Sequence, residues 1–194
     1  MDFRVVDELP HGFGWIASEP GYMQRASHAL AADGRVWLFD AVDMPHLDER
    51  VRALGEPAGV VQLFARHERD GEAIAARLGI EHLVLPDALP GSPFELRRLS
   101  ETEVAVWWPE RRTLLVSESL GSARFNRAGR EPVGVHPLMR FKPPRSLLAF
   151  EPEHVLVGHG EGSHGLEVAA ALHASIRHAG RRTFLLPLNL LPGR

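Results

Sequence analysis

The spacing of apolar residues changes along this chain in a way that predicts alternating strands and helices. Residues 60–64 form a nearly unbroken apolar run, which is typical of a strand covered on both faces. A polar junction follows. Ile74 and Leu78 then lie four residues apart, as on the apolar side of a helix that begins near Asp70 and ends at Gly79.

The elements around this unit extend the same order. Residues 3–6 and 14–17 predict short strands, and residues 25–30 and 35–40 predict a hairpin closed by Asp33-Gly34, which supplies the positive φ angles of a tight turn. An apolar stripe predicts a helix over residues 45–54, capped near Asp43, and residues 80–85 predict another strand. A β-α-β-α-β order favours parallel or mixed pairing with helices outside the sheet.

The second half of the chain predicts a further group of strands, over residues 94–99, 104–108 and 113–117. Residues 121–144 are rich in Gly and Pro and predict an irregular segment with a short helix near 136–140. An apolar strand then ends in Gly158-His159-Gly160. Residues 163–179 predict the final helix.

Composition excludes several classes of protein. A net charge of −3 gives no basis for nucleic-acid binding. No apolar run approaches the roughly 18 residues of a membrane span. The absence of Cys removes disulfides and thiolate ligands, and the start of the sequence has no signal-peptide pattern, so we expect a cytoplasmic protein.

Charged side chains are concentrated at the junction after the buried strand, where open α/β sheets usually bind their ligands. These junction residues are Arg66, His67, Glu68, Arg69 and Asp70. Strict alternation along the strand would place His67 on the opposite side from Arg66 and Glu68, and so outside the site. An irregular junction would instead make His67 a ligand, and both readings remain open.

The strand, polar junction and small-residue helix together resemble the metal-binding segment of the metallo-β-lactamase-fold hydrolases. That family has His-x-His-x-Asp-His here, and this chain has residues 66–71, Arg-His-Glu-Arg-Asp-Gly. Three further matches are a strand ending in Asp40, which is structural in the family, a strand leading to Glu118 in place of a bridging Asp, and His159 as the last ligand. The resemblance implies an α/β (α+β) fold, a four-layer αββα sandwich of two mixed sheets formed by one domain over residues 1–194.

The matched positions hold too few ligands for the two-zinc centre of the family. Of its five His ligands only His159 remains, the segment 99–103 contains no His, and Arg66 cannot lose a proton to bind a metal. We therefore expect no cofactor. The chain would be a metal-free relative that binds a small anionic molecule or a partner protein, with Arg66 and Arg69 supplying the positive charge beside Glu68, Asp70 and Glu118.

The alternative is an enzyme with one unusual metal site. Glu68, Asp70, Glu118 and His159 would then hold a single divalent ion (Mn, Mg or Zn) for hydrolysis, with Asp70 and His159 as candidates for catalysis. Independently of the site, residues 183–194 form a very apolar tail, which either packs on the domain or forms a contact between two copies of the chain.

Overall fold

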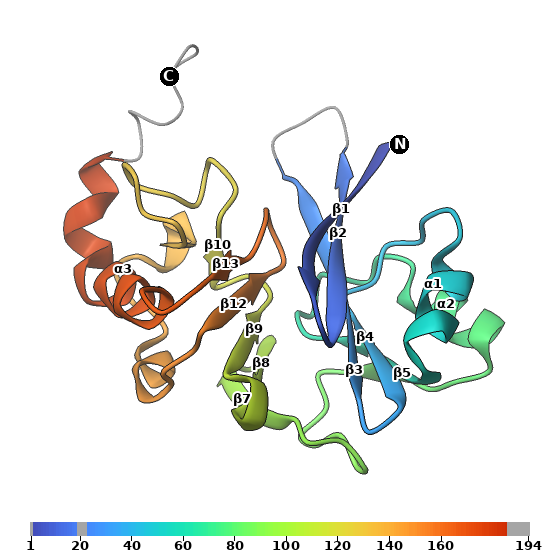
Figure 1. The fold of residues 1–194 in the computed structure, drawn as a ribbon. Coiled ribbons are helices and arrows are strands. Elements are labelled where there is room, and N and C mark those ends of the chain that lie inside the picture. The colour runs from blue at the N-terminus through green and yellow to red at the C-terminus, as the bar shows by residue number, and fades with distance from the viewer. Residues whose placement is uncertain (1, 19–22, 186–194) are drawn as a thin grey trace.

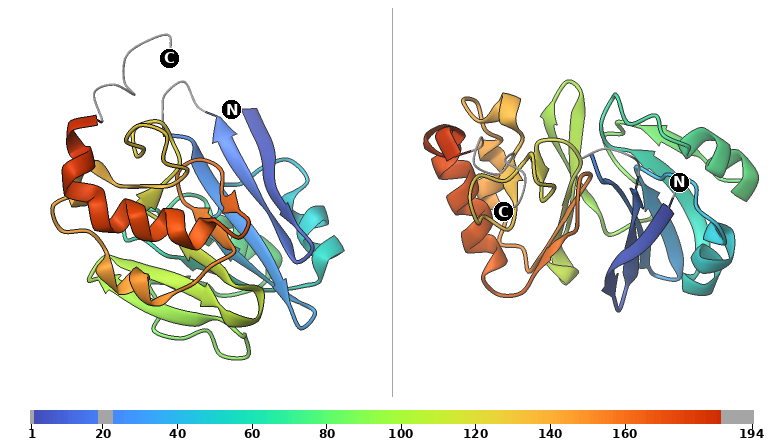
Figure 2. Two further views of the ribbon diagram at one scale, coloured as in Figure 1. Left: turned by 60° about the vertical axis from the view of Figure 1, so that its left-hand side comes forward. Right: turned by 90° about the horizontal axis from the view of Figure 1, so that it is seen from above.

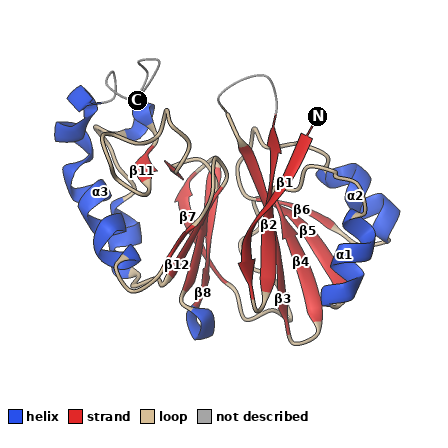
Figure 3. Ribbon diagram, turned by 45° about the horizontal axis from the view of Figure 1, so that its top comes forward, coloured by secondary structure: helices blue, strands red, loops and turns tan. Residues whose placement is uncertain are grey.

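Two β-sheets face each other, and helices cover the outer face of each sheet (Figures 1 and 3). The fold is given by a computed structural model that describes residues 2–18 and 23–185. Viewed from above, the order of layers is helix, sheet, sheet, helix (Figure 2). This arrangement confirms the predicted four-layer αββα sandwich of two mixed sheets.

The first sheet has six strands, which follow one another in sequence order across the sheet. The first four pair antiparallel, and the last two are parallel to the fourth. These strands are β1 (Asp2–Leu9), β2 (Gly12–Ser18), β3 (Arg25–Ala32), β4 (Arg35–Phe39), β5 (Glu56–Gln62) and β6 (His82–Val84). The β3–β4 hairpin turns at Asp33 and Gly34, both with positive φ, as the Asp-Gly pair predicts.

Two short helices connect the parallel strands of this sheet, α1 (Leu47–Leu54) and α2 (Gly71–Leu78). Their buried residues pack together on the outer face of the first sheet, with Leu47 and Val51 from α1 and Ile74 from α2. Helix α1 starts later than the sequence indicates, because His46 in a left-handed conformation precedes it and the residues from Asp43 form a loop.

The second sheet has five strands in the order β13-β12-β9-β8-β7. Strands β9 and β12 are parallel, and the other pairs are antiparallel. Their bounds are β7 (Glu95–Ser100), β8 (Glu103–Trp108), β9 (Thr113–Val116), β12 (His154–Val157) and β13 (Ser163–His164). Among the described residues, no helix is long and apolar enough to cross a bilayer.

Helix α3 (Val168–Arg182) covers the outer face of the second sheet, with Leu172 and Ile176 in its core cluster. It begins at Val168 rather than near Ser163, because Ser163 belongs to β13, and it continues beyond Gly180. A 3-10 turn, Thr183–Leu185, follows it. The rest of the apolar tail, and with it most of the expected contact between two copies of the chain, lies outside the described residues.

The irregular segment between β9 and β12 contains only short elements. Strands β10 (Leu120–Gly121) and β11 (Gly134–Val135) form a small antiparallel pair, and two 3-10 turns follow, Pro137–Met139 and Arg145–Ala149. Three core clusters fill the spaces between the four layers, and the middle one lies between the sheets. Apolar side chains from both sheets meet in the middle cluster, among them Phe39, Val61, Leu115 and Leu156.

Candidate metal centre

Ionisable side chains meet where strands from both sheets end. Asp40 follows β4, His67 follows β5, Glu118 follows β9 and His159 follows β12. The ends of β9 and β12, neighbouring strands of the second sheet, come very close at Gly158 and Ser117, since a Cβ on Gly158 would come within 2.3 Å of the Ser117 carbonyl oxygen. Glycine is therefore needed at this position for β9 and β12 to bring their polar residues together.

Asp40 is buried, and its carboxylate accepts hydrogen bonds from three residues around this cluster. Its Oδ1 accepts the backbone N–H of Leu63 at 2.8 Å, and its Oδ2 accepts Nδ1–H of His67 at 3.0 Å and the hydroxyl of Ser117. Its φ of 45° lies in the left-handed region, which Asp tolerates better than most residues. These contacts agree with the structural role expected for Asp40.

His67 is turned toward the cluster, not away from it. A hydrogen bond from its backbone N–H to the Phe64 carbonyl, at 2.9 Å, forms a turn after β5, so strand alternation does not extend to His67. Because an ionised Asp40 can only accept, Nδ1 of His67 carries the hydrogen. Nε2 of the ring then faces Glu118, 3.4 Å from Oε2.

His159 approaches the same carboxylate oxygen. Its Nδ1–H donates to the Met23 carbonyl at 2.8 Å, which leaves Nε2 3.0 Å from Oε2 of Glu118. His67 and His159 therefore have the same tautomer when they are neutral, with an Nε2 lone pair directed at one oxygen atom.

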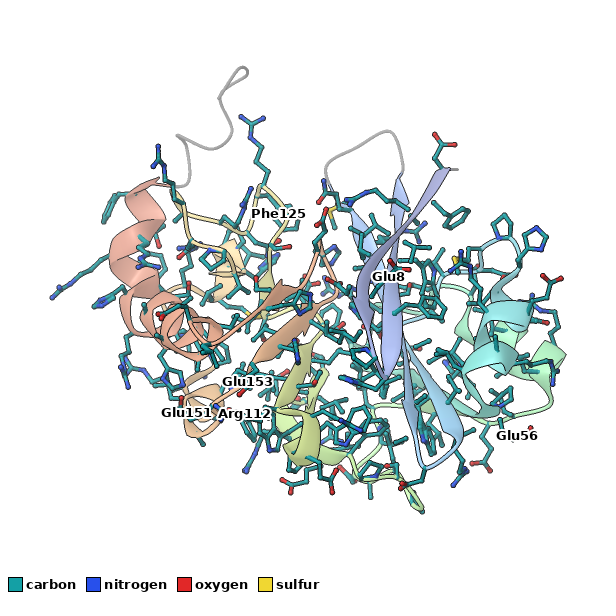
Figure 4. The ribbon with its side chains drawn as sticks, viewed as in Figure 1. Glu8, Glu56, Arg112, Phe125, Glu151 and Glu153 are labelled. Atoms are coloured by element: carbon teal, nitrogen blue, oxygen red, sulfur yellow. The ribbon has the colours of Figure 1, made fainter. Side chains whose placement is uncertain are left out.

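A third histidine, His136, contacts the other oxygen of Glu118. Its Nδ1 accepts the backbone N–H of Leu138 at 3.3 Å, so the neutral ring has its hydrogen on Nε2, 3.4 Å from Oε1 of Glu118. His136 thus presents a hydrogen rather than a lone pair to Glu118, and its contact with Oε1 leaves Oε2 to the other two rings. The ring of Phe125, labelled in Figure 4, packs edge-on to His136 and His159 with centroid separations of 6.0 and 5.8 Å.

The pKa values of these groups are shifted by burial and by their partners. Burial alone would raise the pKa of Asp40, but His67, Arg69 and Ser117 lower it to about 2. Burial opposes ionisation of Glu118 too, yet hydrogen bonds from His159 and His67 hold its pKa far below the ordinary range. For His67, burial and Arg69 favour the neutral ring, but the two carboxylates outweigh them and raise the pKa. A metal-free site therefore holds two carboxylate anions and favours a proton on His67.

Arg69 is a buried cation beside this cluster. Its Nη1 donates to the carbonyls of Ala26 and Asp40 at 2.5 and 2.6 Å, and its Nη2 donates to the Gly158 carbonyl at 3.1 Å. Nη2 also lies 3.2 Å from Nδ1 of His67, but both atoms carry hydrogens, so this contact is not a hydrogen bond. Arg69 thus links strand ends of the two sheets and keeps a positive charge next to the histidines.

Glu103 is a second buried carboxylate and holds the backbone that carries Glu118. Its Oε1 accepts the backbone N–H groups of Glu118 and Ser119 at 2.7 and 2.9 Å, and its Oε2 accepts the Ser119 hydroxyl. Burial raises its pKa. The sequence did not indicate this role for Glu103, because its partners lie 15 and 16 residues away in another strand end.

The described residues contain one group of three side chains whose ligand atoms all lie within 4.8 Å of one another, namely His67, Glu118 and His159. Two imidazole nitrogens and one carboxylate oxygen form a ligand set that catalytic zinc sites use, with a further coordination position left for water or substrate. The chain therefore has the donors for one metal ion.

Several solved structures share this architecture, two metallo-β-lactamases and TMB-1 among them. DIM-1 metallo-β-lactamase has a TM-score of 0.62 with 14% identity, covering 95% of this chain and 98% of that one. TMB-1 has a TM-score of 0.60 with 13% identity, covering 94% of this chain and 97% of that one. A metallo-β-lactamase from Pontibacter korlensis has a TM-score of 0.62 with 10% identity, covering 91% of this chain and 99% of that one. This chain has the metallo-β-lactamase fold. No protein-family model and no curated protein matches its sequence.

Within this fold, the structure brings together some of the sequence-predicted site residues but not others. Glu118, His159 and Arg69 lie in the cluster, as expected. Arg66 and Glu68 are exposed on the junction. Asp70 directs its Oδ2 to the backbone N–H of Asp43, at 2.8 Å, and so ties the start of α2 to the preceding loop.

The structure therefore does not bring together the expected four-ligand set of Glu68, Asp70, Glu118 and His159, and the side chains that do meet are those of His67, Glu118 and His159. The reason is the turn after β5, which directs His67 toward Glu118 and leaves Glu68 exposed. If His67 is placed at the first His of the motif quoted above, Arg69 stands at the second His and Gly71 at the Asp. Arg69 cannot ligate a metal ion, and its positive charge beside His67 opposes the binding of a second cation there.

The exposure of Arg66 also changes what its replacement should do. Among residues 2–18 and 23–185, no ion pair involves Arg66, although the sequence suggested that it balances the site carboxylates. We expect Arg66→Met to change the free energy of unfolding by less than about 0.5 kcal/mol, as for most surface substitutions. Denaturant titration at neutral pH measures this, and a loss of several kcal/mol would return Arg66 to the site.

Proposed function

We propose that this chain is a hydrolase that binds one divalent metal ion through His67, Glu118 and His159. One observation carries the proposal. In their neutral forms, His67 and His159 each donate Nδ1–H to an oxygen acceptor, and each directs an Nε2 lone pair at Oε2 of Glu118. Two lone pairs facing an anion repel it, so each ring needs a proton there, or the three ligand atoms need a metal cation between them.

The donor set favours zinc among the divalent ions. Two imidazoles with one carboxylate suit zinc, whereas magnesium and calcium prefer sites built from oxygen atoms. In a tetrahedral zinc site, neighbouring ligand atoms are separated by about 3.3 Å, given bond lengths near 2.0–2.1 Å. The separations of 3.0 and 3.4 Å from Oε2 of Glu118 to the two Nε2 atoms agree with this value.

A metal ion held in this way would supply the Lewis acid that polarises a carbonyl or phosphoryl group in hydrolysis. The protein's own residues prepare the ligands for it. Asp40 and the Met23 carbonyl hold the tautomers of His67 and His159, the outer partners that orient metal-binding histidines in many sites. His136 lies 3.4 Å from Oε1 of Glu118 and leaves Oε2 available.

Purified protein reconstituted with zinc and dialysed against metal-free buffer is expected to retain one zinc ion per chain, as measured by elemental analysis. Binding should also release protons, because the metal-free site favours protonated His67, and the apparent affinity should fall as the pH is lowered. Calorimetric titrations in two buffers with different ionisation enthalpies count these protons.

A protein with His178 replaced by alanine is the matched control, since His178 is exposed on α3 and should leave both results unchanged. Retention of two zinc ions per chain would contradict the role of Arg69 in excluding a second metal. Retention of none, with no heat of binding, would overturn the metal proposal.

A metal-free binding protein for a small anionic molecule is the second candidate, and Arg69 is the observation that favours it. Its buried guanidinium acts on Asp40 and Glu118 electrostatically, in part as a metal ion would. In that case the site would work with a protonated His67 and the Arg69 cation, and the reconstitution experiment would find no zinc.

A further inference from the structure

A groove of about 490 Å³ lies beside the candidate centre, between the end of β7 and the two 3-10 turns of the irregular segment. Its apolar lining includes Leu99, Leu138, Met139 and Pro143. The volume falls within the range of about 300–1,000 Å³ that is usual for small-molecule sites. We call it the Pro143 groove.

Large apolar side chains are exposed around the Pro143 groove. Leu138, in its lining, is 88% exposed, and Phe141 on the same segment is 80% exposed. Single exposed apolar residues are ordinary, but Leu138 lies in an apolar groove, and Phe141 is three residues further along the same segment. Such a surface is stabilised when an apolar group covers it.

The charged side chains that line the Pro143 groove are all positive. Lys142 and Arg145 belong to its lining and are exposed. In the part of the chain that the structure describes, neither side chain forms an ion pair, and the groove lining contains no Asp or Glu. An apolar surface with two cations at its edge is complementary to a molecule with an apolar chain and an anionic end.

We propose that the Pro143 groove binds a small amphipathic anion, an alkyl-chain carboxylate. The alkyl chain of this ligand lies on Leu99, Leu138 and Pro143, and its carboxylate lies between Lys142 and Arg145. The proposal does not rest on a metal ion. Ser119 also lines the groove, directly follows Glu118, and places its hydroxyl 3.2 Å from the sulfur of Met139, so the bound molecule would lie next to the candidate centre.

Competition against a dansyl-labelled fatty acid tests the proposal, with the full chain and with ligands kept below micelle-forming concentrations. We expect dodecanoate to displace the probe, dodecanol to do so at least about tenfold less well, and dodecyltrimethylammonium to fail. The double variant Lys142→Glu/Arg145→Glu should lose at least about tenfold in affinity for dodecanoate, and Leu138→Asp should lose affinity for both alkyl ligands.

Two control variants separate this result from other causes. Arg52→Glu reverses an exposed charge on α1 and should bind dodecanoate as the parent does. His159→Ala removes a proposed metal ligand and should also keep dodecanoate binding, which distinguishes failure of the groove from failure of the metal site. Equal binding of dodecanol and dodecanoate, or binding only to anionic lipid vesicles, would overturn the proposal.

Discussion

Replacing Asp40 with alanine is expected to lower the free energy of unfolding by about 3–5 kcal/mol, the usual result of breaking a buried charged pair from one side. The substitution leaves the Leu63 N–H without its acceptor, and His67 and Ser117 lose their contacts with the carboxylate. At about 2–4 °C per kcal/mol for a chain of this size, the melting temperature should fall by roughly 6–20 °C. Urea titration and thermal melting measure both quantities.

The matched control is Asp87→Ala. Asp87 forms an ion pair with Arg98 at 2.6 Å, but its side chain is 90% exposed, so the loss should be about 0–1 kcal/mol. If Asp40→Ala proved no more destabilising than this control, the buried network would have little importance for stability.

The same substitution has a signature in the pH dependence of stability. Folding lowers the pKa of Asp40 from 3.8 to about 2. A carboxyl pKa that is lowered by folding adds stability. This stability is fully present when the pH is above the pKa of the unfolded state, and it is lost as the pH falls through the pKa of the folded state. The difference in unfolding free energy between parent and Asp40→Ala should therefore shrink by roughly 2 kcal/mol between about pH 5 and pH 2.

The second large effect concerns metal affinity. His159→Ala is expected to weaken zinc binding by more than the roughly 10–100-fold that the loss of an outer partner costs, because it removes one of three proposed ligands. Asp40→Asn, which changes the partner of His67 but leaves all three proposed ligands in place, should cost about 10–100-fold. Competition with a chromophoric chelator gives both affinities.

His136→Gln distinguishes a ligand from a donor. Since Nε2 of His136 carries hydrogen toward Glu118, its loss should weaken zinc binding less than His159→Ala does. Unchanged affinity in His159→Ala would place the metal elsewhere. A loss in His136→Gln as large as that in His159→Ala would make His136 a ligand.

The hydrophobic pattern was sufficient to predict many of the strands and helices, but neither the order of the layers nor the direction of each polar side chain. Periodicity found β5, α2 and the hairpin of β3 and β4, because burial of one or both faces imposes a spacing on each element. The αββα order followed from these elements and from the family resemblance at the strand ends.

The residues at the junction after β5 could not be placed in this way. Strand alternation ends at Gln62, and the turn that carries His67 inward depends on a hydrogen bond between His67 and Phe64 that no apolar spacing reveals. When Asp70 is matched to the Asp of the family motif, Arg66 falls at the first His and is expected in the site. In the structure, the turn brings His67 to the site and leaves Arg66 exposed. The role of Glu103 depends on contacts between separate strand ends, which periodicity does not reveal.

Arg69 has a consequence for how the chain reaches this structure. Its guanidinium bridges to a carbonyl 89 positions away, at Gly158, and the Asp40–Ser117 contact joins residues 77 positions apart. Closing such distant segments costs chain entropy before their contacts are gained, and topologies of this kind fold slowly. The centre should therefore be among the last parts to assemble. Isolated amino-terminal and carboxy-terminal fragments would each lack it, and a bound ion would act as a clamp that opposes separation of the two halves.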